Sequence, residues 1–141
     1  MFLVDTSAVS ELRKVSSGRA HPDVVAWFRA TATELISLSV ISVMELEIGI
    51  GRIERRDPSQ GHRIRQWYER AVLPSFEGRL LPVDDRVARR CAGLHVPDPR
   101  PERDALIAAT ALVHGLTVVT RNVADFAPMG VRLLDPWAVT P

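Results

Sequence analysis

The sequence predicts an α/β fold in which helices cover both faces of a mainly parallel sheet of about five strands. Its apolar runs are short and unbroken, as in strands that are buried on both faces. These runs alternate with segments whose apolar residues recur at helical spacing, the pattern of parallel strands joined by crossover helices. A length of 141 residues, 46% hydrophobic and 25% charged, fits one compact domain. We therefore expect a single three-layer α/β/α domain over residues 1–141.

The first half of the chain begins with an unbroken apolar strand at residues 2–4. We expect Thr6 or Ser7 to cap the short helix that follows this strand and runs to Leu12. Ser42 and Glu45 have the spacing of a capping box and predict the start of a later helix. Between these lie an expected helix over about residues 22–32 and an expected strand over about residues 35–39.

The second half contains three further strands and two clear helices. Residues 52–79 carry no recognisable signature beyond the suggestion of a helix around residues 67–72. Asp84 is expected to cap a helix that runs to about Leu94, and residues 104–114 are apolar nearly all round, which predicts a buried helix. The expected strands are residues 80–83, 117–120 and 131–134.

The formal net charge of +1 gives the protein no global field that would draw it to nucleic acid or to an anionic membrane. That total conceals a local excess, because the six arginines from Arg52 to Arg70 face three acidic residues in the same segment, a local charge of +3. The single cysteine, Cys91, excludes an intrachain disulfide and a thiolate zinc site, which favours a cytoplasmic location. No apolar run approaches the ~20 residues that span a bilayer, so we expect no membrane association.

Four acidic residues fall at the predicted carboxyl edge of the sheet, where ligands bind in open α/β folds. Their mutual repulsion in a partly desolvated pocket would raise their pKa values and weaken the fold unless a cation were present. Hard oxygen donors without histidine or cysteine suit Mg²⁺, with Mn²⁺ as a substitute. The four residues are Asp5, Glu45, Asp104 and Asp125.

Each of these carboxylates also has a structural explanation. Glu45 can complete the capping box with Ser42, and Asp104 lies at the positive end of a helix. Asp5 can cap the helix after the first strand, and Asp125 can form an ordinary turn. Their common position at one edge of the sheet favours a metal site over four separate explanations.

The helix expected after Ser42 presents two further features. Gly49 and Arg52 share a side with Glu45, because the three are spaced i, i+4 and i+7, and a glycine there leaves room for a substrate close to the backbone. Met44 and Ile48 form a second, small apolar patch. This patch suits either burial within the fold or contact with a second subunit.

Four sequence blocks carry these acidic residues: FLVDTSA at residues 2–8, SVMELEIG at 42–49, RDALIAATA at 103–111 and VVTRNVADF at 118–126. Together they resemble the PIN-domain ribonucleases, in particular the VapC and FitB-like toxins of bacterial toxin–antitoxin pairs. The blocks stand in the family's order and span nearly the whole chain apart from residues 52–79. One such block is a weak signal, whereas four at compatible spacing are specific.

The resemblance implies a metal-binding catalytic site made of Asp5, Glu45, Asp104 and Asp125, with polar support from Thr6, Ser7, Thr120 and Asn122. It also implies a homodimer and a cognate antitoxin whose C-terminal segment lies over the active site, often with an arginine that reaches the carboxylates. Contact with DNA would be indirect, through that antitoxin. Arg103 departs from the family, which usually has a smaller or polar residue beside Asp104, and this departure predicts altered metal affinity or substrate approach.

We hypothesise a Mg²⁺-dependent endoribonuclease, with water as the nucleophile in an in-line attack on the RNA phosphodiester. Arg52 and Arg121 are candidates for contacts with the RNA backbone, so binding is expected to be salt-sensitive. The main alternative is a catalytically weak module that keeps the acidic pocket and binds RNA or the antitoxin. A haloacid-dehalogenase phosphatase fits poorly because Ser7 stands where a second aspartate is required, and a receiver domain because Lys14 is the only lysine.

Overall fold

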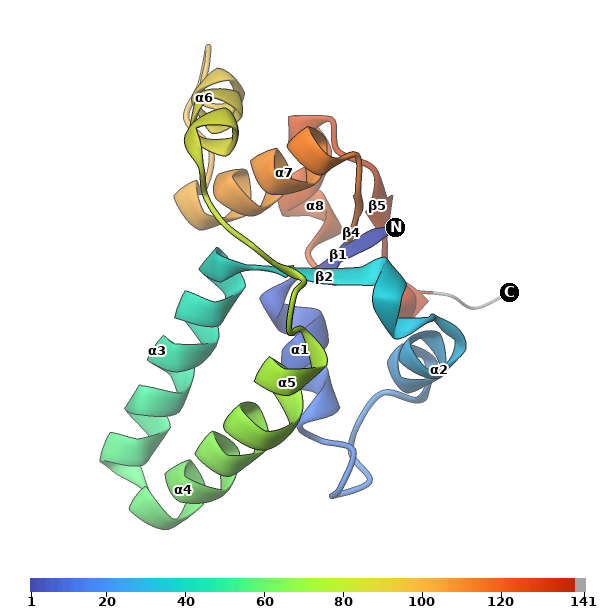
Figure 1. The fold of residues 1–141 in the computed structure, drawn as a ribbon, viewed down its shortest axis with the longest axis vertical. Coiled ribbons are helices and arrows are strands. Elements are labelled where there is room, and N and C mark those ends of the chain that lie inside the picture. Colours follow the sequence, from blue (N-terminus) through green and yellow to red (C-terminus); the bar gives the residue numbers. More distant parts are fainter. Residues whose placement is uncertain (139–141) are drawn as a thin grey trace.

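Five parallel strands form the centre of the fold (Figure 1). The computed structural model describes residues 1–138, and its strands are β1 (Phe2–Val4), β2 (Ile36–Ser39), β3 (Leu80–Leu81), β4 (Thr117–Val119) and β5 (Leu133–Leu134). They pair in the order β3-β2-β1-β4-β5, and every pair is parallel. The predicted α/β class with a parallel sheet is confirmed, although the two edge strands are shorter than the sequence suggests.

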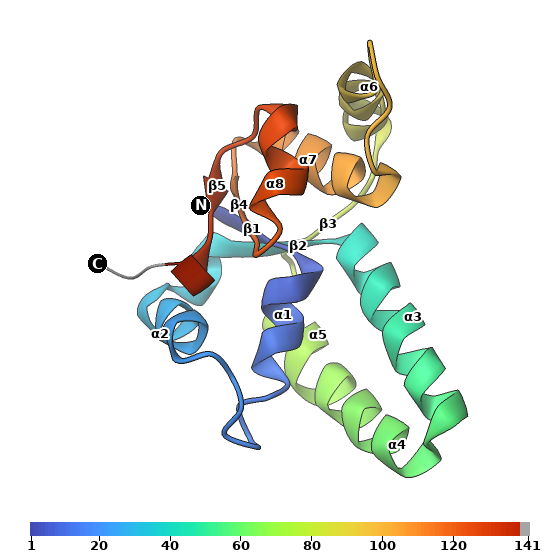
Figure 2. The ribbon, with the colours of Figure 1, turned by 180° about the vertical axis from the view of Figure 1, so that it is seen from behind.

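Helices cover both faces of this sheet (Figures 1 and 2). One face carries α1 (Thr6–Leu12), α2 (Pro22–Ala30), α3 (Val40–Arg56), α4 (Pro58–Trp67), a π-helical turn η2 (Tyr68–Val72) and α5 (Leu73–Ser75). The other face carries α6 (Asp85–Leu94), α7 (Glu102–His114) and α8 (Val123–Phe126). Short 3₁₀ turns are η1 (Thr33–Leu35), η3 (Ala127–Met129) and η4 (Pro136–Ala138). Within residues 1–138, no helix has both the length and the apolar character needed to cross a membrane.

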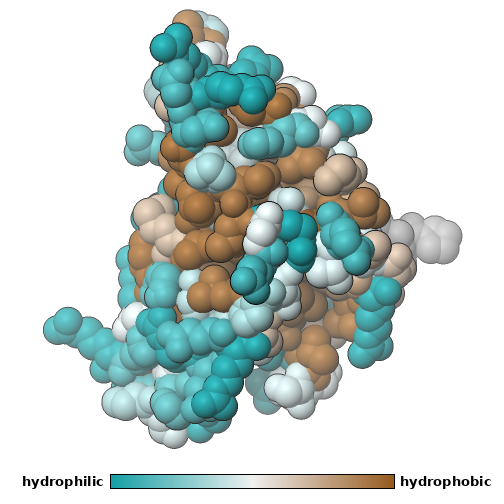
Figure 3. Space-filling model, viewed as in Figure 1, coloured by the Kyte–Doolittle hydropathy of each residue, from teal (hydrophilic) through white to brown (hydrophobic). Residues whose placement is uncertain are grey.

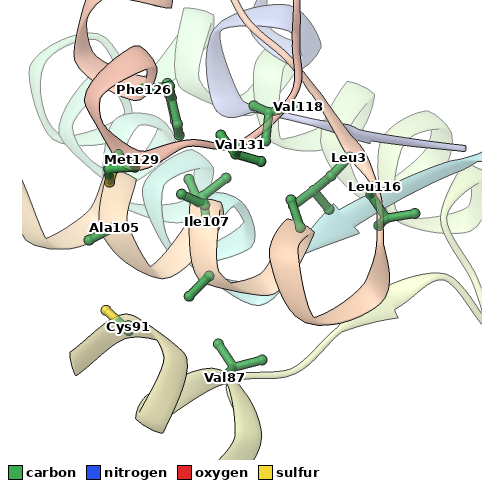
Figure 4. Close-up of a cluster of buried hydrophobic side chains, with 13 residues drawn as sticks. Leu3, Val87, Cys91, Ala105, Ile107, Leu116, Val118, Phe126, Met129 and Val131 are labelled. Carbon is green, nitrogen blue, oxygen red and sulfur yellow. The ribbon is translucent and has the colours of Figure 1, made fainter. Parts of the chain in front are cut away.

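Side-chain alternation along β1 and β4 divides the core into two parts. Leu3 and Val118 pack with Ile107 of α7 on one face of the sheet (Figure 4). Val4 and Val119 pack on the opposite face, against residues of α1, α3 and α4. Because all four strand residues are fully buried, both faces of the two central strands are covered, and the chain that leaves each strand starts from a fixed position.

The prediction of a buried helix is confirmed by α7, which packs on β4 and lies beneath α6. The buried side of α7 is built largely from small side chains, which let the helix approach the sheet closely: Ala105, Ala108, Ala109 and Ala111. The helix begins at Glu102, two residues before the expected start, so Asp104 lies in its first turn.

Residues 52–79, which carry little signature in the sequence, complete a helical hairpin of α3 and α4. Asp57 caps α4 by accepting a hydrogen bond from the Gln60 N–H at 3.2 Å, and Pro58 occupies the first helical position. Gly61 lies so close to α3 that a Cβ atom there would stand 2.4 Å from the Cα atom of Glu54. We call residues 40–67 the α3–α4 hairpin.

The capping box expected at Ser42 and Glu45 is wrong. α3 begins at Val40, and the Ser39 hydroxyl caps it by accepting a hydrogen bond from the Ile41 N–H at 3.0 Å. Ser39 is the cap because it is the last residue of β2, so the extended backbone of a cap is already in place. Ser42 is therefore inside the helix, buried, and its hydroxyl has no hydrogen-bond partner among the described residues.

The expected cap of α1 by Thr6 or Ser7 is also wrong. Both residues lie within the helix, and Asp5 is the cap, because its side chain accepts a hydrogen bond from the Ala8 N–H. The structural explanation considered for Asp5 in the sequence is thus correct. It does not exclude a second role, because the carboxylate has further contacts at the sheet edge.

Candidate active site

Asp5 and Thr120 meet at the carboxyl ends of the neighbouring strands β1 and β4. β1 and β4 pair with Val4 opposite Val119, so the residues that follow these strands are neighbours. The Asp5 N–H donates to the Val119 carbonyl at 3.0 Å, and the Thr120 hydroxyl donates to Asp5 Oδ2 at 2.5 Å. The register of the sheet therefore positions this carboxylate.

The Asp5 carboxylate is buried, with 4% of the residue exposed. Besides Thr120, the Ser7 hydroxyl donates to Oδ1 at 2.6 Å and the Ala8 N–H donates to the same oxygen at 3.0 Å. Burial raises the pKa of Asp5, and the hydrogen bonds from Ser7, Thr120 and Ala8 oppose that rise without cancelling it. The side chain thus has one fixed orientation and a poorly solvated charge.

Glu45 joins three helices at this edge. It lies in the second turn of α3, where its Oε1 accepts a hydrogen bond from the Thr6 hydroxyl of α1 at 2.6 Å. Its Oε2 lies 3.8 Å from Nη1 of Arg103 in the first turn of α7. The contact to Arg103 was not anticipated from the sequence, although the position of this arginine directly before an acidic site residue could have indicated it.

Asp104 is half-buried in the first turn of α7 and faces other negative charges. Burial is the main cause that raises its pKa, followed by the charges of Asp125, Glu45 and Asp5. These charges act on Asp104 because the fold brings β1, α3, α7 and α8 to the same edge of the sheet. The structure thus places all four predicted acidic residues at one site, and their role in metal binding stays a prediction.

The loop between β4 and α8 supports the site mainly through its backbone. The Asn122 N–H donates to the Thr120 hydroxyl at 2.9 Å, which leaves the hydroxyl proton directed at Asp5. The Asp125 N–H donates to the Asn122 carbonyl at 3.1 Å and begins the short helix α8, on which Asp125 is exposed. Within the described residues the Asn122 side chain makes no hydrogen bond, so its support for the site is a backbone contribution.

The two arginines predicted to contact RNA have different surroundings. The Arg121 N–H donates to Ser7 Oγ at 3.4 Å, and its guanidinium lies 5.7 Å from the centre of the Trp137 ring, in a cation–π contact. Arg52 is exposed on α3 and forms no ion pair among residues 1–138. Of the two, Arg52 therefore has the freer guanidinium.

A cavity of about 90 Å³ adjoins the site between α1 and the α3–α4 hairpin. Thr6, Glu45 and Gly49 are among its lining residues. Gly49 faces open space, as the sequence predicts, but a Cβ atom would also fit there because nothing lies within 4 Å of its position. A glycine is thus compatible with substrate passage and is not required for it by space alone.

The donor chemistry of this edge fits a hard divalent cation. The groups that face one another here are carboxylate and hydroxyl oxygens, and the Arg103 guanidinium forms an ion pair with one of the carboxylates, that of Glu45. Within residues 1–138, no three acidic, histidine or cysteine side chains lie close enough together to hold a metal ion as they stand. The site therefore has suitable donors, and its carboxylates would have to move closer together to share one ion.

Comparison with protein families and characterised sequences gives a consistent result. A family profile described as the PIN domain matches residues 2–128. The VapC ribonuclease Y4jK of Sinorhizobium fredii is 35% identical to the chain, with 97% of this chain and 98% of that protein covered. Toxin FitB of Neisseria gonorrhoeae is also 35% identical, with 97% and 99% covered.

Solved structures resemble the chain over the same extent. The crystal structure of FitAcB from Neisseria gonorrhoeae matches with a TM-score of 0.89 and 32% identity, covering 99% of this chain and 100% of that chain. A structure of FitAB bound to an IR36 DNA fragment matches with a TM-score of 0.89 and 30% identity, covering 100% and 99%. The similarity therefore extends over nearly the whole chain.

Proposed function

The chain belongs to the PIN-domain family, and from this premise we propose that it is a Mg²⁺-dependent endoribonuclease that acts as the toxin of a toxin–antitoxin pair. One observation carries the proposal: the fold gathers carboxylates at one edge of the sheet, where Asp5 is held by Thr120 and Glu45 by Thr6, and where burial and the other three carboxylates raise the pKa of Asp104. Such an arrangement weakens the fold unless a bound cation compensates it, so it favours a functional site over a structural one. The relatives named as a VapC ribonuclease and as toxin FitB support the activity and the role.

The residues that would hold Mg²⁺, or Mn²⁺ in its place, are Asp5, Glu45, Asp104 and Asp125. A bound ion of this kind supplies charge stabilisation at the phosphate and activation of the attacking water. Asp5 presents its oxygens in one orientation, because Ser7 and Thr120 donate to different oxygens of the carboxylate. No side chain of the site is required as the nucleophile.

Two side chains next to Glu45 would have separate roles in the proposed reaction. Thr6 donates to one Glu45 oxygen and fixes the direction of the other. Arg103 lies near that second oxygen and, half exposed, can turn to a phosphate oxygen as negative charge develops there. Arg52, on the same helix as Glu45, would neutralise a neighbouring phosphate, and Arg121 would take part only by leaving its Trp137 contact.

Cleavage of RNA by the purified protein with Mg²⁺, with Mn²⁺ and with a chelator tests the proposal. Glu45→Gln removes the charge but keeps an acceptor for Thr6, and we expect cleavage to fall at least ~100-fold, about 2.7 kcal/mol in transition-state stabilisation. Glu34→Gln, at an exposed glutamate in η1, is the matched control and should retain activity. Absence of cleavage with either metal, or full activity of Glu45→Gln, would contradict the proposal.

The alternative of a catalytically weak binding module gives a different pattern in the same experiments. It is favoured by one observation, the lack of a ready-made metal-holding group among residues 1–138. A calorimetric titration with Mg²⁺ and an RNA-binding measurement then decide between the two functions. If the protein binds metal and RNA but does not cleave the RNA, the result would contradict the nuclease function and support the binding module.

We also propose an antitoxin partner and a homodimer, with any DNA contact made indirectly through the antitoxin, and a cytoplasmic location. The FitAcB and DNA-bound FitAB structures support the first of these. For the dimer, apolar surface gathers across the middle of one face of the molecule, above the hydrophilic end of the α3–α4 hairpin (Figure 3). Val40, Met44 and Leu80 are 36%, 40% and 37% exposed, and the pairing of Ser39 with Leu81 brings the first and last of them to the same edge.

The dimer is tested by sedimentation of two charge variants. Met44→Glu places a charge in this apolar surface and should yield monomers. Val15→Glu is the control, because Val15 is equally exposed, at 42%, in the loop after α1. A monomeric wild-type protein, or a dimer that Met44→Glu does not weaken, would contradict this assignment.

A further inference from the structure

Two neighbouring cavities lie along α1, and the smaller one is beside the acidic site. The cavity of about 90 Å³ beside Thr6 and Glu45 shares three lining residues, Arg13, Ile64 and Trp67, with a second cavity of about 430 Å³. The second cavity is lined by residues of the loop after α1 and of helix α4. This loop lies at the end of α1 that is remote from the sheet (Figure 2). The two cavities are therefore adjacent, with Glu45 of the acidic site beside the smaller one, and we call the two together the groove.

The remote end of this groove is basic. Its lining includes four cations and no acidic residue: Arg13, Lys14, Arg19 and Arg63, together with Ser16, Ser17 and Gln60. Arg13, Arg19 and Arg63 are exposed and form no ion pair within residues 1–138. Arg65, two residues further along α4, contrasts with them because it is paired with Glu47 and Glu54. The hairpin thus neutralises Arg65 internally, whereas Arg63 donates only to the uncharged Ser59 hydroxyl, at 3.1 Å, and keeps an unneutralised charge.

The loop that carries three of these cations is anchored by a buried carboxylate. Glu11 is 6% exposed and accepts hydrogen bonds from the His21 N–H at 2.9 Å and from the Lys14 ammonium at 3.1 Å. Arg19 closes the loop through an N–H bond to the Lys14 carbonyl at 3.1 Å. The cations therefore stand on a fixed backbone, which lowers the entropic cost of binding a charged ligand.

We propose that this groove binds the single-stranded RNA that flanks the scissile bond, with Arg13, Arg19 and Arg63 on its phosphates and Trp67 beside a base. The assignment rests on the proposed nuclease function. Seven residues of α1 separate the acidic edge from Arg13, a length of ~10 Å at the helical rise, which a single strand covers with very few nucleotides. Arginine phosphate contacts combined with an aromatic side chain are the usual means of holding single strands.

The test compares two double variants in RNA binding and in cleavage. Arg13→Gln/Arg63→Gln removes two groove cations, and Arg86→Gln/Arg90→Gln removes two exposed arginines of α6 as the matched control. Binding is measured in the Asp5→Asn background, with a long labelled oligouridine and with a dinucleotide. We expect the groove variant to lose on the order of tenfold in affinity for the long strand and to lower the salt slope by about 1.4. The control and the dinucleotide should show no change.

Cleavage by otherwise wild-type protein separates failure of the groove from failure of the proposed function. The groove variant should lower kcat/KM for the long strand and leave dinucleotide cleavage unchanged. If the wild type cleaves RNA and the groove variant binds and cleaves as it does, the groove assignment is overturned and the nuclease stands. If the wild type cleaves no RNA and only the groove variant loses affinity for the long strand, the proposed nuclease function is contradicted and the groove remains an RNA-binding site. Equal loss in both double variants, or weakened binding of a co-purified antitoxin with unchanged RNA affinity, also overturns the groove assignment.

Discussion

The acidic edge and the α3–α4 hairpin use the same kinds of charged side chain with opposite consequences. In the hairpin, Arg65 donates to Glu54 at 2.8 Å and to Glu47 at 2.5 Å, and these hydrogen bonds raise its pKa. At the edge, burial and the neighbouring carboxylates raise the pKa of Asp104, and the cation Arg103 lies 3.8 Å from a different carboxylate, that of Glu45. Paired charges stabilise the hairpin, whereas unbalanced charges at the edge cost stability and prepare a site for a cation.

The largest expected effect separates activity from stability at the edge. Asp104→Asn removes a repelled charge, so we expect cleavage to fall by at least ~100-fold while the free energy of unfolding rises by about 1 kcal/mol. Urea unfolding and an RNA cleavage assay measure the two quantities. Asp98→Asn, in the exposed loop before α7, is the control and should change neither. A destabilised Asp104→Asn protein would show that this carboxylate supports the fold.

Metal addition should act on the edge alone. At a Mg²⁺ concentration of 100 times the dissociation constant, we expect the folded state to gain about 2.7 kcal/mol, measured as a rise in the melting temperature. Asp104→Asn should lose most of this gain, and a hairpin variant should keep it. The same rise in Asp104→Asn as in the wild type would place the metal elsewhere.

Removing the Arg65 ion pairs of the α3–α4 hairpin should lower stability and leave cleavage nearly unchanged, the reverse of the effects expected for Asp104→Asn. Arg65→Gln leaves Glu47 and Glu54 facing each other, and we expect the melting temperature to fall by about 2–4 °C while cleavage stays close to that of the wild type. Arg56→Gln, at an exposed arginine at the end of α3, is the matched control. A large loss of cleavage in Arg65→Gln would mean that the hairpin holds the site as well as the fold.

The smallest effects are those of pH, and they differ in sign. The folded-state pKa of Asp104 is raised, so the stability gained in Asp104→Asn is present at neutral pH and disappears as the pH falls to about 3.8, the ordinary value. The hydrogen bond from Arg65 lowers the pKa of Glu54. The stability that Glu54 contributes is therefore present above pH 4.5, its ordinary pKa value, and is lost as the pH falls through its folded-state pKa. Urea titrations of Asp104→Asn and Arg65→Gln over this pH range should therefore show a gain in the free energy of unfolding for the first and a loss for the second. Both differences should vanish in acid. A constant difference at all pH values would exclude titration as the cause.

The sequence predicted the features that follow from strand ends and apolar pattern. Asp5 directly follows a buried strand and Asp104 starts a buried helix, so topology alone places both at the carboxyl edge. Competition between candidate caps was not predictable in this way. Ser39 and Ser42 are both serines ahead of a helical pattern, and the end of β2 decides between them.

Contacts between distant polar residues were beyond the sequence pattern. The Arg65 pairing joins residues 11 and 18 positions apart on two helices, and periodicity carries no signal for it. Gly61 is similar, because its close approach to Glu54 depends on how the two helices pack. The groove along α1 also depends on this packing, and it could not be inferred from the local charge of residues 52–70.

The bond between Asp5 and Thr120 joins positions 115 residues apart, and this separation affects when the site can exist during synthesis. A growing chain carries Asp5 long before residue 120, so β1 lacks its β4 neighbour, and Asp5 lacks its Thr120 donor, until more than a hundred further residues have been added. Asp104 and Asp125 also arrive late. A ribosome that translates this message is therefore not exposed to an assembled acidic site on its own nascent chain until the segment from Asp104 to Asp125 has been made.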